Sequence, residues 1–304
     1  MPSAIDAVRD AFVRSSGGRI EQPTRLALEG GAALAMLASD RDGLGTVLKA
    51  VTVRPANRER GVPAVQAVVI WFDGSTGVPL ALIDGEALTA LRTGAASGVA
   101  TDLLAPADAS VLAMIGAGAQ AADQVRAVCA VRPIREVRVA SRHPARGDEF
   151  VTRLAQEVGP IRVVARTVRD ALDGAQVVCT ATPVTEPLFA ASDLGTDVHV
   201  NAIGAYTRDM CELPPELFAD ASVVAVDSID AAMSEAGDVL RAIRDGRLTR
   251  ARLVEIGMLA AGSAAAAPGG RTVFKSVGVA AQDWALARLA VERAAAAGVM
   301  DPQD

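Results

Sequence analysis

The sequence has few of the residues on which several protein classes depend. Its three cysteines, Cys129, Cys179 and Cys211, are far apart and lack CxxC spacing. They predict reduced, mostly buried thiols in a cytoplasmic protein rather than a disulfide framework. The two histidines, His143 and His199, are too few for the usual histidine-based metal site, and no HExxH motif occurs. We therefore expect no metal.

Long apolar runs and a basic charge balance are also missing. Hydrophobic residues make up 51% of the 304, but no stretch approaches the ~20 apolar residues of a membrane-spanning helix. The N-terminus shows no basic segment followed by an apolar core, so we expect no secretory signal. A net charge of −6 and an aromatic content of 3% disfavour nucleic-acid binding and base stacking. The class that remains is a soluble α/β enzyme with neither a membrane nor a nucleic-acid partner.

From about residue 108, short apolar runs alternate with segments of helical periodicity. This order predicts a parallel sheet with right-handed crossovers, the doubly wound Rossmann arrangement. The predicted strands are 111–115, 136–140, 161–165, 176–182, 197–204 and 221–228, and the predicted helices are 119–131, 150–158 and 168–175.

The first part of the chain has a different pattern. Two long apolar strands, 45–53 and 64–72, are followed by a turn rich in Gly, Ser and Pro and then by a long helix over 85–105. A small-residue linker at 261–270 precedes the last segments, which end in a helix over 280–297. We predict an α+β domain of residues 1–107 with 277–304, and a dinucleotide-binding domain of residues 108–276.

A glycine-rich turn follows the first strand of the predicted Rossmann domain. Its residues match GxGxxA, in which the first glycine allows a tight turn and the second lets the backbone approach a pyrophosphate. The helix that follows would direct free N–H groups at the phosphates. A glycine turn without a ligand is the alternative. The predicted cofactor contacts here are Gly116, Ala117, Gly118, Ala119 and Gln120, with Ala121 packing the helix on the strand.

The end of the second predicted strand indicates which dinucleotide binds. NAD-dependent enzymes commonly carry an acid there, but this chain continues Ser141-Arg142-His143. Ser141 and Arg142 can hydrogen-bond a 2′-phosphate, which an acid would repel. NADP(H) is therefore favoured, with NAD(H) as the alternative if Arg142 is simply a solvated surface cation.

Segments along nearly the whole chain resemble one family. They include "QPTR" (22–25), "LKAVTVRPANRERGVPAVQA" (48–67), "TGVPLALIDGEALTALRTGAAS" (76–97), "IGAGAQA" (115–121), "TATPVTEPLF" (180–189), "HVNAIGAYTRDMCEL" (199–213), "AGDV" (236–239) and "VFKSVGVAAQD" (273–283). In these segments the chain resembles the ornithine cyclodeaminase/mu-crystallin family, which also contains ketimine reductases and an archaeal-type alanine dehydrogenase. The resemblance implies a homodimer built through the first domain, which would also bind the substrate.

The same resemblance implies a carboxylate-binding site between the two domains, formed by Arg25, Lys49 and Arg92. An arginine fork holds a carboxylate at two points, and a second cation fixes its orientation. Lys49 is also the candidate to relay a proton. Other interpretations are that Arg25 caps a surface and that Arg92 pairs with Glu86, whereas Lys49 lies in an apolar strand, an unusual place for an unpartnered ammonium.

Further cofactor contacts follow from family position. Thr93 is expected to face the phosphates, and Thr182, Lys275 and Ser276 are expected to approach the nicotinamide. Thr180 and Ile203 are two further expected cofactor contacts.

Two positions depart from the cyclodeaminase pattern. Tyr206 occupies the position where cyclodeaminases carry an aspartate that handles the substrate amine. Cyclodeaminases also carry an acid near position 34, where this chain has Leu34. A pocket without both acids does not easily neutralise a dibasic amino acid. Tyr206, also a candidate catalytic residue, and Asp209 are expected to shape the far wall of the substrate site.

These features favour NAD(P)H-dependent reduction of a cyclic imino acid such as Δ1-pyrroline-2-carboxylate or Δ1-piperideine-2-carboxylate. The cofactor would supply the hydride, and the protein would supply orientation and electrostatics. Three alternatives stay open: an ornithine cyclodeaminase, an alanine-type amino-acid dehydrogenase, and a non-catalytic NADPH-dependent binding protein.

Overall fold

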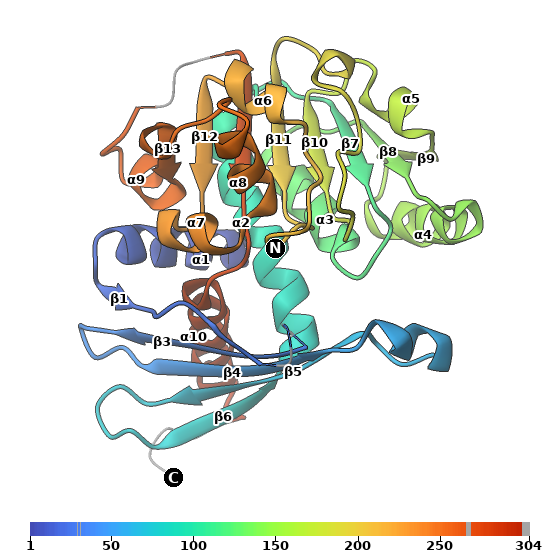
Figure 1. The fold of residues 1–304 in the computed structure, drawn as a ribbon. Helices are drawn as coiled ribbons and strands as arrows, with labels where there is room; N and C mark the ends of the chain where they lie inside the picture. The colour runs from blue at the N-terminus through green and yellow to red at the C-terminus, as the bar shows by residue number, and fades with distance from the viewer. Residues whose placement is uncertain (29, 31, 266–268, 300–304) are drawn as a thin grey trace.

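Two β-sheets of different construction divide the chain, which the computed structural model describes over residues 1–28, 30, 32–265 and 269–299 (Figure 1). The first sheet is antiparallel, in the order β1-β3-β4-β5-β6, with β2 paired to β3. Its strands are β1 (Ile20–Glu21), β2 (Leu26–Leu28), β3 (Ala33–Asp40), β4 (Thr46–Val53), β5 (Val65–Phe72) and β6 (Pro79–Asp84).

The second sheet is parallel throughout and has the order β13-β12-β14-β11-β10-β7-β8-β9. The strand order reverses between β7 and β10, the point at which doubly wound sheets open a ligand crevice. The Rossmann prediction is therefore confirmed. The strands are β7 (Val111–Ile115), β8 (Glu136–Ala140), β9 (Arg162–Ala165), β10 (Val177–Thr180), β11 (Val198–Ala202), β12 (Val223–Val226), β13 (Leu253–Glu255) and β14 (Arg271–Lys275).

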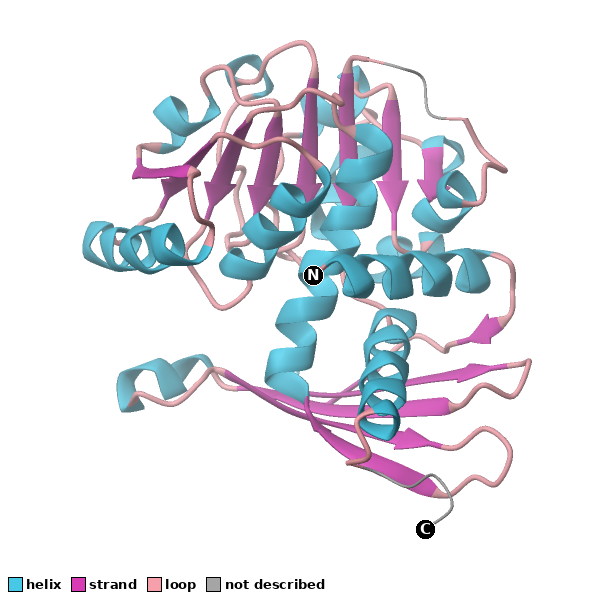
Figure 2. Cartoon of the chain, turned by 180° about the vertical axis from the view of Figure 1, so that it is seen from behind, coloured by secondary structure: helices cyan, strands magenta, loops and turns pink. Residues whose placement is uncertain are grey.

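Helices cover both sheets and join them (Figure 2). Helix α2 runs from the antiparallel sheet up against the parallel one, α1 lies between the sheets, and α10 lies across one face of the antiparallel strands. The helices are α1 (Pro2–Ser16), α2 (Gly85–Leu104), α3 (Ala121–Val131), α4 (Pro144–Glu157), α5 (Val168–Leu172), α6 (Pro215–Asp220), α7 (Ile229–Glu235), α8 (Gly237–Arg244), α9 (Ile256–Ala260) and α10 (Ala280–Ala296), with short 3₁₀ segments at Pro55–Arg60, Ala191–Asp193 and Arg250–Arg252.

Several elements differ from their predicted form for identifiable reasons. Strands β1, β2 and β3 were not predicted, because their small apolar residues lack a clear alternation and their pairing with one another and with β4 decides the conformation. Helix α4 begins earlier than predicted because Pro144 occupies its first turn. Helix α3 begins at Ala121 because the preceding residues form the glycine turn.

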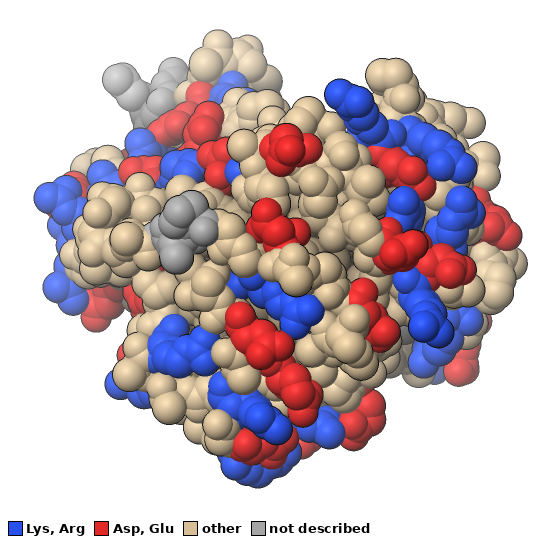
Figure 3. Space-filling model, turned by 90° about the horizontal axis from the view of Figure 1, so that it is seen from above, with Lys and Arg blue, Asp and Glu red and all other residues tan. Residues whose placement is uncertain are grey.

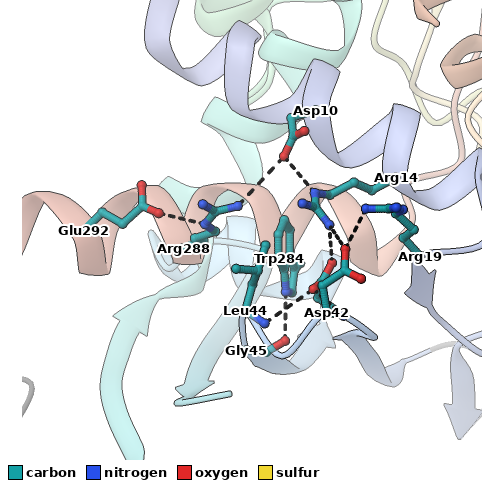
Figure 4. A network of polar contacts seen from close by, with 10 residues as sticks. Asp10, Arg14, Arg19, Asp42, Leu44, Gly45, Trp284, Arg288 and Glu292 are labelled. Atoms are coloured by element: carbon teal, nitrogen blue, oxygen red, sulfur yellow. Dashed lines mark hydrogen bonds and ion pairs between the residues drawn. The ribbon is translucent and has the colours of Figure 1, made fainter. Parts of the chain in front are cut away.

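A polar network fastens the two ends of the chain to the first sheet (Figure 4). Arg14 of α1 donates to the buried Asp40, the last residue of β3, at 2.8 Å and to Asp42 in the β3–β4 connection at 2.9 Å. Trp284 of α10 donates its indole N–H to the carbonyl of Gly45 in the same connection at 3.0 Å. Helices α1 and α10 are therefore held at one end of the antiparallel sheet.

A second buried network joins α2 to the parallel sheet. The His199 ring lies 2.9 Å from the Thr272 hydroxyl and 3.1 Å from the Asn201 amide oxygen, and the Asn201 amide donates to Thr101 of α2 at 2.9 Å. Burial lowers the pKa of His199 to about 4, so the ring is neutral near neutral pH. His199 is therefore a structural histidine that helps to fix the helix connecting the two sheets.

Seen from above the parallel sheet, the surface shows positive and negative side chains intermingled (Figure 3). Within the described residues, no helix is both long and apolar enough to cross a membrane. Over the same ranges, no group of three or more His, Cys, Asp or Glu side chains is arranged to hold a metal ion.

Candidate functional site

The glycine turn has the geometry of a phosphate-binding loop. Gly116 follows β7 with a φ of +111°, and a Cβ there would lie 2.7 Å from the carbonyl oxygen of Ala181. A Cβ on Gly118, by contrast, would meet no protein atom within 4 Å. The first glycine is therefore required by the fold, and the second leaves open space in front of the N-terminus of α3. A dinucleotide pyrophosphate fits this loop by the chemistry of its free N–H groups.

Helix α2 packs tightly beside this loop. A Cβ on Gly94 would collide with the carbonyl oxygen of Asp123, in the first turn of α3. Thr93 is therefore held near the phosphate loop, and its hydroxyl donates to the carbonyl of Thr89 at 2.7 Å. The buried amide oxygen of Gln120 has no hydrogen-bond partner among the described residues, which leaves it available to a ligand.

Ser141 and Arg142 lie at the carboxyl end of β8, next to β7. The Ser141 hydroxyl accepts the backbone N–H of His143 at 3.2 Å. Arg142 is exposed and makes no ion pair with the described part of the chain. The structure thus places a hydroxyl and an exposed cation at the strand end where the 2′-position of the adenosine ribose is bound in this fold.

The carboxyl ends of β10, β11 and β14 lie next to one another and carry the residues expected near the nicotinamide. Thr180 and Ile203 are buried there, and the Ile203 N–H donates to the carbonyl of Thr180 at 3.0 Å. Ser276 is 2% exposed and donates to Asp227 at 2.8 Å. The same Asp227 carboxylate accepts the N–H of Gly278 at 2.8 Å, so it fixes the chain that leaves β14.

Lys275 is placed differently from the expectation that it faces the nicotinamide. Its side chain is fully buried, and its ammonium lies 2.8 Å from the buried Asp238 carboxylate. Lys275 is therefore an internal ion-pair partner of Asp238. Thr182 is partly exposed and donates through its backbone N–H and its hydroxyl to Glu212 at 2.7 and 2.8 Å. Sequence reasoning assigned no role to Glu212 or Asp238.

Lys49 and Arg92 meet at one carboxylate. Asp283 Oδ1 lies 2.9 Å from Lys49 Nζ and 3.3 Å from Arg92 Nε. Lys49 is 2% exposed, Arg92 7% and Asp283 not at all, and Arg92 also donates to Gln282. Burial, opposed by Asp283 and reinforced by Arg92, lowers the pKa of Lys49 to about 8. Arg92 thus pairs with Asp283 rather than with Glu86.

Arg25 is held by a carboxylate that the sequence analysis did not place. Its Nε and Nη2 lie 2.9 and 2.7 Å from the two carboxylate oxygens of Glu235, at the end of α7. Nη2 also donates to the carbonyl of Tyr206 at 2.8 Å, and the guanidinium lies 5.9 Å from the centre of the Tyr206 ring. Burial raises the pKa of Glu235 against the opposing charge of Arg25. These contacts join the first sheet region to the Rossmann region.

A cavity of about 300 Å³ opens between the two regions beside these groups. Gly278 lines it, and a Cβ there would lie 2.7 Å from Arg92 Nη1, so the guanidinium stands just behind the wall. Met36, which also lines the cavity, is opposite Lys49 in the β3–β4 register. The lining residues are Gln22, Pro23, Thr24, Arg25, Met36, Ser228, Asp230, Ala231, Glu235, Gly278, Val279 and Ala280.

Two expectations about this cavity change. It contains acidic side chains, Glu235 and Asp230, although positions 34 and 206 carry none. Asp209 does not line it, because Asp209 is exposed in a separate groove of about 550 Å³ on the Rossmann region. Glu235 and Asp283 lie 210 and 234 residues from their partners Arg25 and Lys49, so no local motif could have identified them.

A doubly wound sheet with a glycine-rich phosphate loop, together with a cavity lined by Arg25 between the two regions, is typical of a nicotinamide-dinucleotide enzyme. The chain belongs to the ornithine cyclodeaminase/mu-crystallin family, whose family model matches residues 1–298. It is an NAD(P)-dependent oxidoreductase.

Similar proteins cover most of the chain. The chain is 37% identical over 255 residues to a Delta(1)-pyrroline-2-carboxylate reductase of Bacillus cereus, covering 83% of this chain and 78% of that one. It is 34% identical over 296 residues to the ketimine reductase mu-crystallin of Mus musculus, covering 94% and 89%. A solved structure of Thermococcus litoralis Delta(1)-pyrroline-2-carboxylate reductase, in complex with NADH and L-proline, superposes with a TM-score of 0.92 at 32% identity and covers 98% and 94%.

Proposed function

We propose that the protein reduces the C=N bond of a cyclic imino acid, of the Δ1-pyrroline-2-carboxylate and Δ1-piperideine-2-carboxylate class, with NADPH preferred to NADH. The relatives named above carry reductase activities of this kind. The observation that carries the proposal is the pair of buried cations that share one carboxylate behind the cavity wall.

The two positive charges of Lys49 and Arg92 are balanced by only one negative charge, that of Asp283, among the described residues. Two cations contact a single oxygen of Asp283, and the other oxygen has no hydrogen-bond partner in the described part of the chain. A second negative charge is therefore needed to balance the pair in a site of low polarity. The carboxylate of an imino acid supplies that charge and places the adjacent C=N carbon beside the nicotinamide wall.

Arg25 completes the site from the other side of the cavity. Its fork already holds Glu235, so a substrate carboxylate would compete with Glu235 for the same donors. The centre of the Tyr206 ring lies 5.9 Å from the Arg25 guanidinium, and Tyr206 lies behind the residues that line the cavity, so its ring would reach a cyclic substrate only next to Arg25.

Lys49 is the proposed proton source for the imine nitrogen. A pKa of about 8 leaves most of the ammonium protonated at neutral pH while weakening its hold on the proton. The hydroxyl of Thr89, 2.5 Å from Lys49 Nζ, and the Asp283 carboxylate fix its position.

The cofactor, when bound, supplies the hydride. The residues that would hold it are the Gly116–Gln120 loop at the pyrophosphate, Thr93 beside that loop, and Thr182 and Ser276 at the nicotinamide end. Ser141 and Arg142 would bind the 2′-phosphate of NADPH, and this preference rests on the hydroxyl and the free cation at the end of β8.

We also infer a homodimer through the open face of the first sheet. Leu37, Leu48, Ile70 and Leu82 stand opposite one another across four strands, facing away from α10. Leu37 and Leu82 are 43% and 74% exposed, and a continuous apolar row of this kind is typical of an interface. Leu82→Asp should reduce the mass measured by light scattering to that of a monomer, whereas Met258→Asp on α9 should not. A monomeric wild type would refute the inference.

The test of the activity is consumption of NADPH or NADH against a panel of cyclic imino acids. We expect turnover of Δ1-pyrroline-2-carboxylate or Δ1-piperideine-2-carboxylate, faster with NADPH. Pyruvate with ammonia tests the amino-acid dehydrogenase alternative, and binding of NADPH without turnover of any imine would support a binding protein.

Cyclodeaminase activity is the second candidate, and Glu235 and Asp230 in the cavity keep a diamino acid chemically reasonable. Tyr206 argues against it, because a phenol, unlike the aspartate carboxylate expected in a cyclodeaminase, is a poor general base toward an amine. Ammonia release from L-ornithine with NAD⁺, measured for the wild type and for Tyr206→Asp, separates the two activities. Robust release by the wild type would overturn the reductase proposal.

A further inference from the structure

A buried carboxylate ties two strand ends together beneath the cofactor crevice. Glu212 is fully buried. One of its oxygens accepts the backbone N–H and the hydroxyl of Thr182, at 2.7 and 2.8 Å. The other accepts the backbone N–H groups of Gly204 and Ala205, at 2.8 and 3.1 Å. Thr182 follows β10 and the other two residues follow β11, so a single side chain sets the spacing of two neighbouring loops.

The clamped loops touch the dinucleotide turn directly. A Cβ on Gly116 would lie 2.7 Å from the carbonyl oxygen of Ala181 and 3.2 Å from the methyl group of Thr182. The approach between the two clamped loops is also close, because a Cβ on Gly204 would collide with the backbone nitrogen of Thr182. A shift of Thr182 would therefore change the wall beside the turn.

Glu212 is itself held by a buried ion pair. One oxygen of Asp238 accepts the backbone N–H groups of Glu212 and Leu213, at 2.6 and 2.9 Å. The other lies 2.8 Å from the ammonium of Lys275, the last residue of β14, and both side chains are fully buried. The arrangement connects the carboxyl ends of β10, β11 and β14, the three strands that wall the nicotinamide end.

A carboxylate is the side chain that these four donors require. A buried charge is costly unless hydrogen bonds and an opposite charge compensate it, and Glu212 has four donors with Lys275 nearby. An amide of the same shape has one oxygen and an NH₂ group, so it would present donors to one of the two loops. Because burying this charge costs free energy, the position of Glu212 beside the crevice suggests that it serves to position a bound ligand.

We propose that Glu212 is a positioning residue that fixes Thr182 and the Gly204–Ala205 backbone as the wall against which the nicotinamide half of the dinucleotide binds. This rests on the cofactor placement in the proposed function, but not on the identity of the substrate. The adenine half binds at the end of β8 and does not depend on this wall.

The experiment compares whole cofactors with their adenine halves on the full-length protein. Glu212→Gln should weaken binding of NADPH and NADH, measured by nicotinamide fluorescence, by about tenfold or more. Binding of adenosine 2′,5′-bisphosphate and AMP, measured by calorimetry, should be unchanged. Glu212→Asp keeps the charge and should recover part of the lost affinity. Glu186→Gln removes an exposed carboxylate from a nearby loop and should change neither ligand class.

The outcomes separate local positioning from general stability. Equal losses for whole cofactors and adenine halves, or no loss at all, would overturn the proposal. If Glu212→Gln does not fold, Glu212→Asp, which keeps the charge on a shorter side chain, should give a smaller loss with the same selectivity. An unselective loss there would again overturn the proposal. Wild-type protein that binds NADPH but reduces no imine refutes the proposed substrate and leaves this comparison intact.

Discussion

The dinucleotide turn and the cation pair are built in opposite ways. The turn consists of consecutive residues, Gly116 to Gln120, and acts through backbone N–H groups and the absence of side chains. The pair combines Lys49 and Arg92 with Asp283, a residue that lies far away in the sequence. The turn is therefore encoded by a short local motif, whereas the cation pair forms only when the two sheets pack together in the folded chain.

Substitutions in the turn and in the cation pair should also have different consequences. A backbone loop that binds an anion contains no buried charge, so a substitution in it leaves no charged side chain without a partner. A buried pair of cations depends on every partner, because removing one leaves a charge without compensation. Substitutions in the cation pair should therefore have larger effects on activity than substitutions in the turn.

The largest effect is expected for Arg92→Lys. A lysine keeps the positive charge but cannot contact Gln282 and Asp283 from one planar group, so the carboxylate would be bound out of alignment. We expect kcat/KM for the imino acid to fall by about 100-fold or more. Steady-state kinetics provide the measurement, with NADPH affinity determined separately as the control. Wild-type kinetics in this variant would remove Arg92 from the carboxylate site.

Gly116→Ala and Gly118→Ala should separate folding from cofactor binding. At Gly116 a methyl group meets the Ala181 carbonyl at a positive φ, so the free energy of unfolding should fall by about 1–3 kcal/mol. At Gly118 a methyl group meets no protein atom, so stability should hold while NADPH binding weakens by about tenfold or more. Calorimetric unfolding and fluorescence titration measure the two effects. Unchanged NADPH binding in Gly118→Ala would show that the pyrophosphate lies elsewhere.

The sequence allowed prediction of the turn and the parallel sheet because both depend on short-range patterns. The same is true of α2, where Asp84 accepts the N–H of Glu86 at 2.8 Å and so begins the helix as its N-cap. The partners Asp283 and Glu235 could not be predicted, because an acid in a helix is usually a surface residue and only the tertiary fold buries these two. Lys275 was placed at the nicotinamide by family position, but its burial against Asp238 depends on how β14 enters the centre of the sheet.

Arg142→Ala tests the proposed binding site for the 2′-phosphate at the end of β8. Its guanidinium is exposed and makes no ion pair in the described ranges, so its removal should not disturb the fold. Loss of a charge-assisted contact with the 2′-phosphate should weaken NADPH binding about tenfold and leave NADH binding nearly unchanged. Fluorescence titration with both cofactors is the measurement. Equal changes for both would mean that Arg142 does not read the 2′-phosphate.

The smallest effect expected is a pH dependence that originates in Lys49. Its pKa of about 8 lies below the ordinary lysine value because burial penalises the ammonium, and Asp283 partly opposes that shift. If the ammonium donates the proton, kcat/KM for imine reduction should be constant at lower pH and should fall as the pH rises through 8, by about twofold at pH 8 itself. The substrate also titrates, but its ionisation does not depend on the protein. Asp283→Asn removes the charge that raises the Lys49 pKa, so the break in the profile should move to lower pH, whereas Glu86→Gln in the first turn of α2 should leave it in place. A break that stays fixed in Asp283→Asn would assign it to the substrate, and a profile that is flat through pH 8 in the wild type would exclude Lys49 as the proton source.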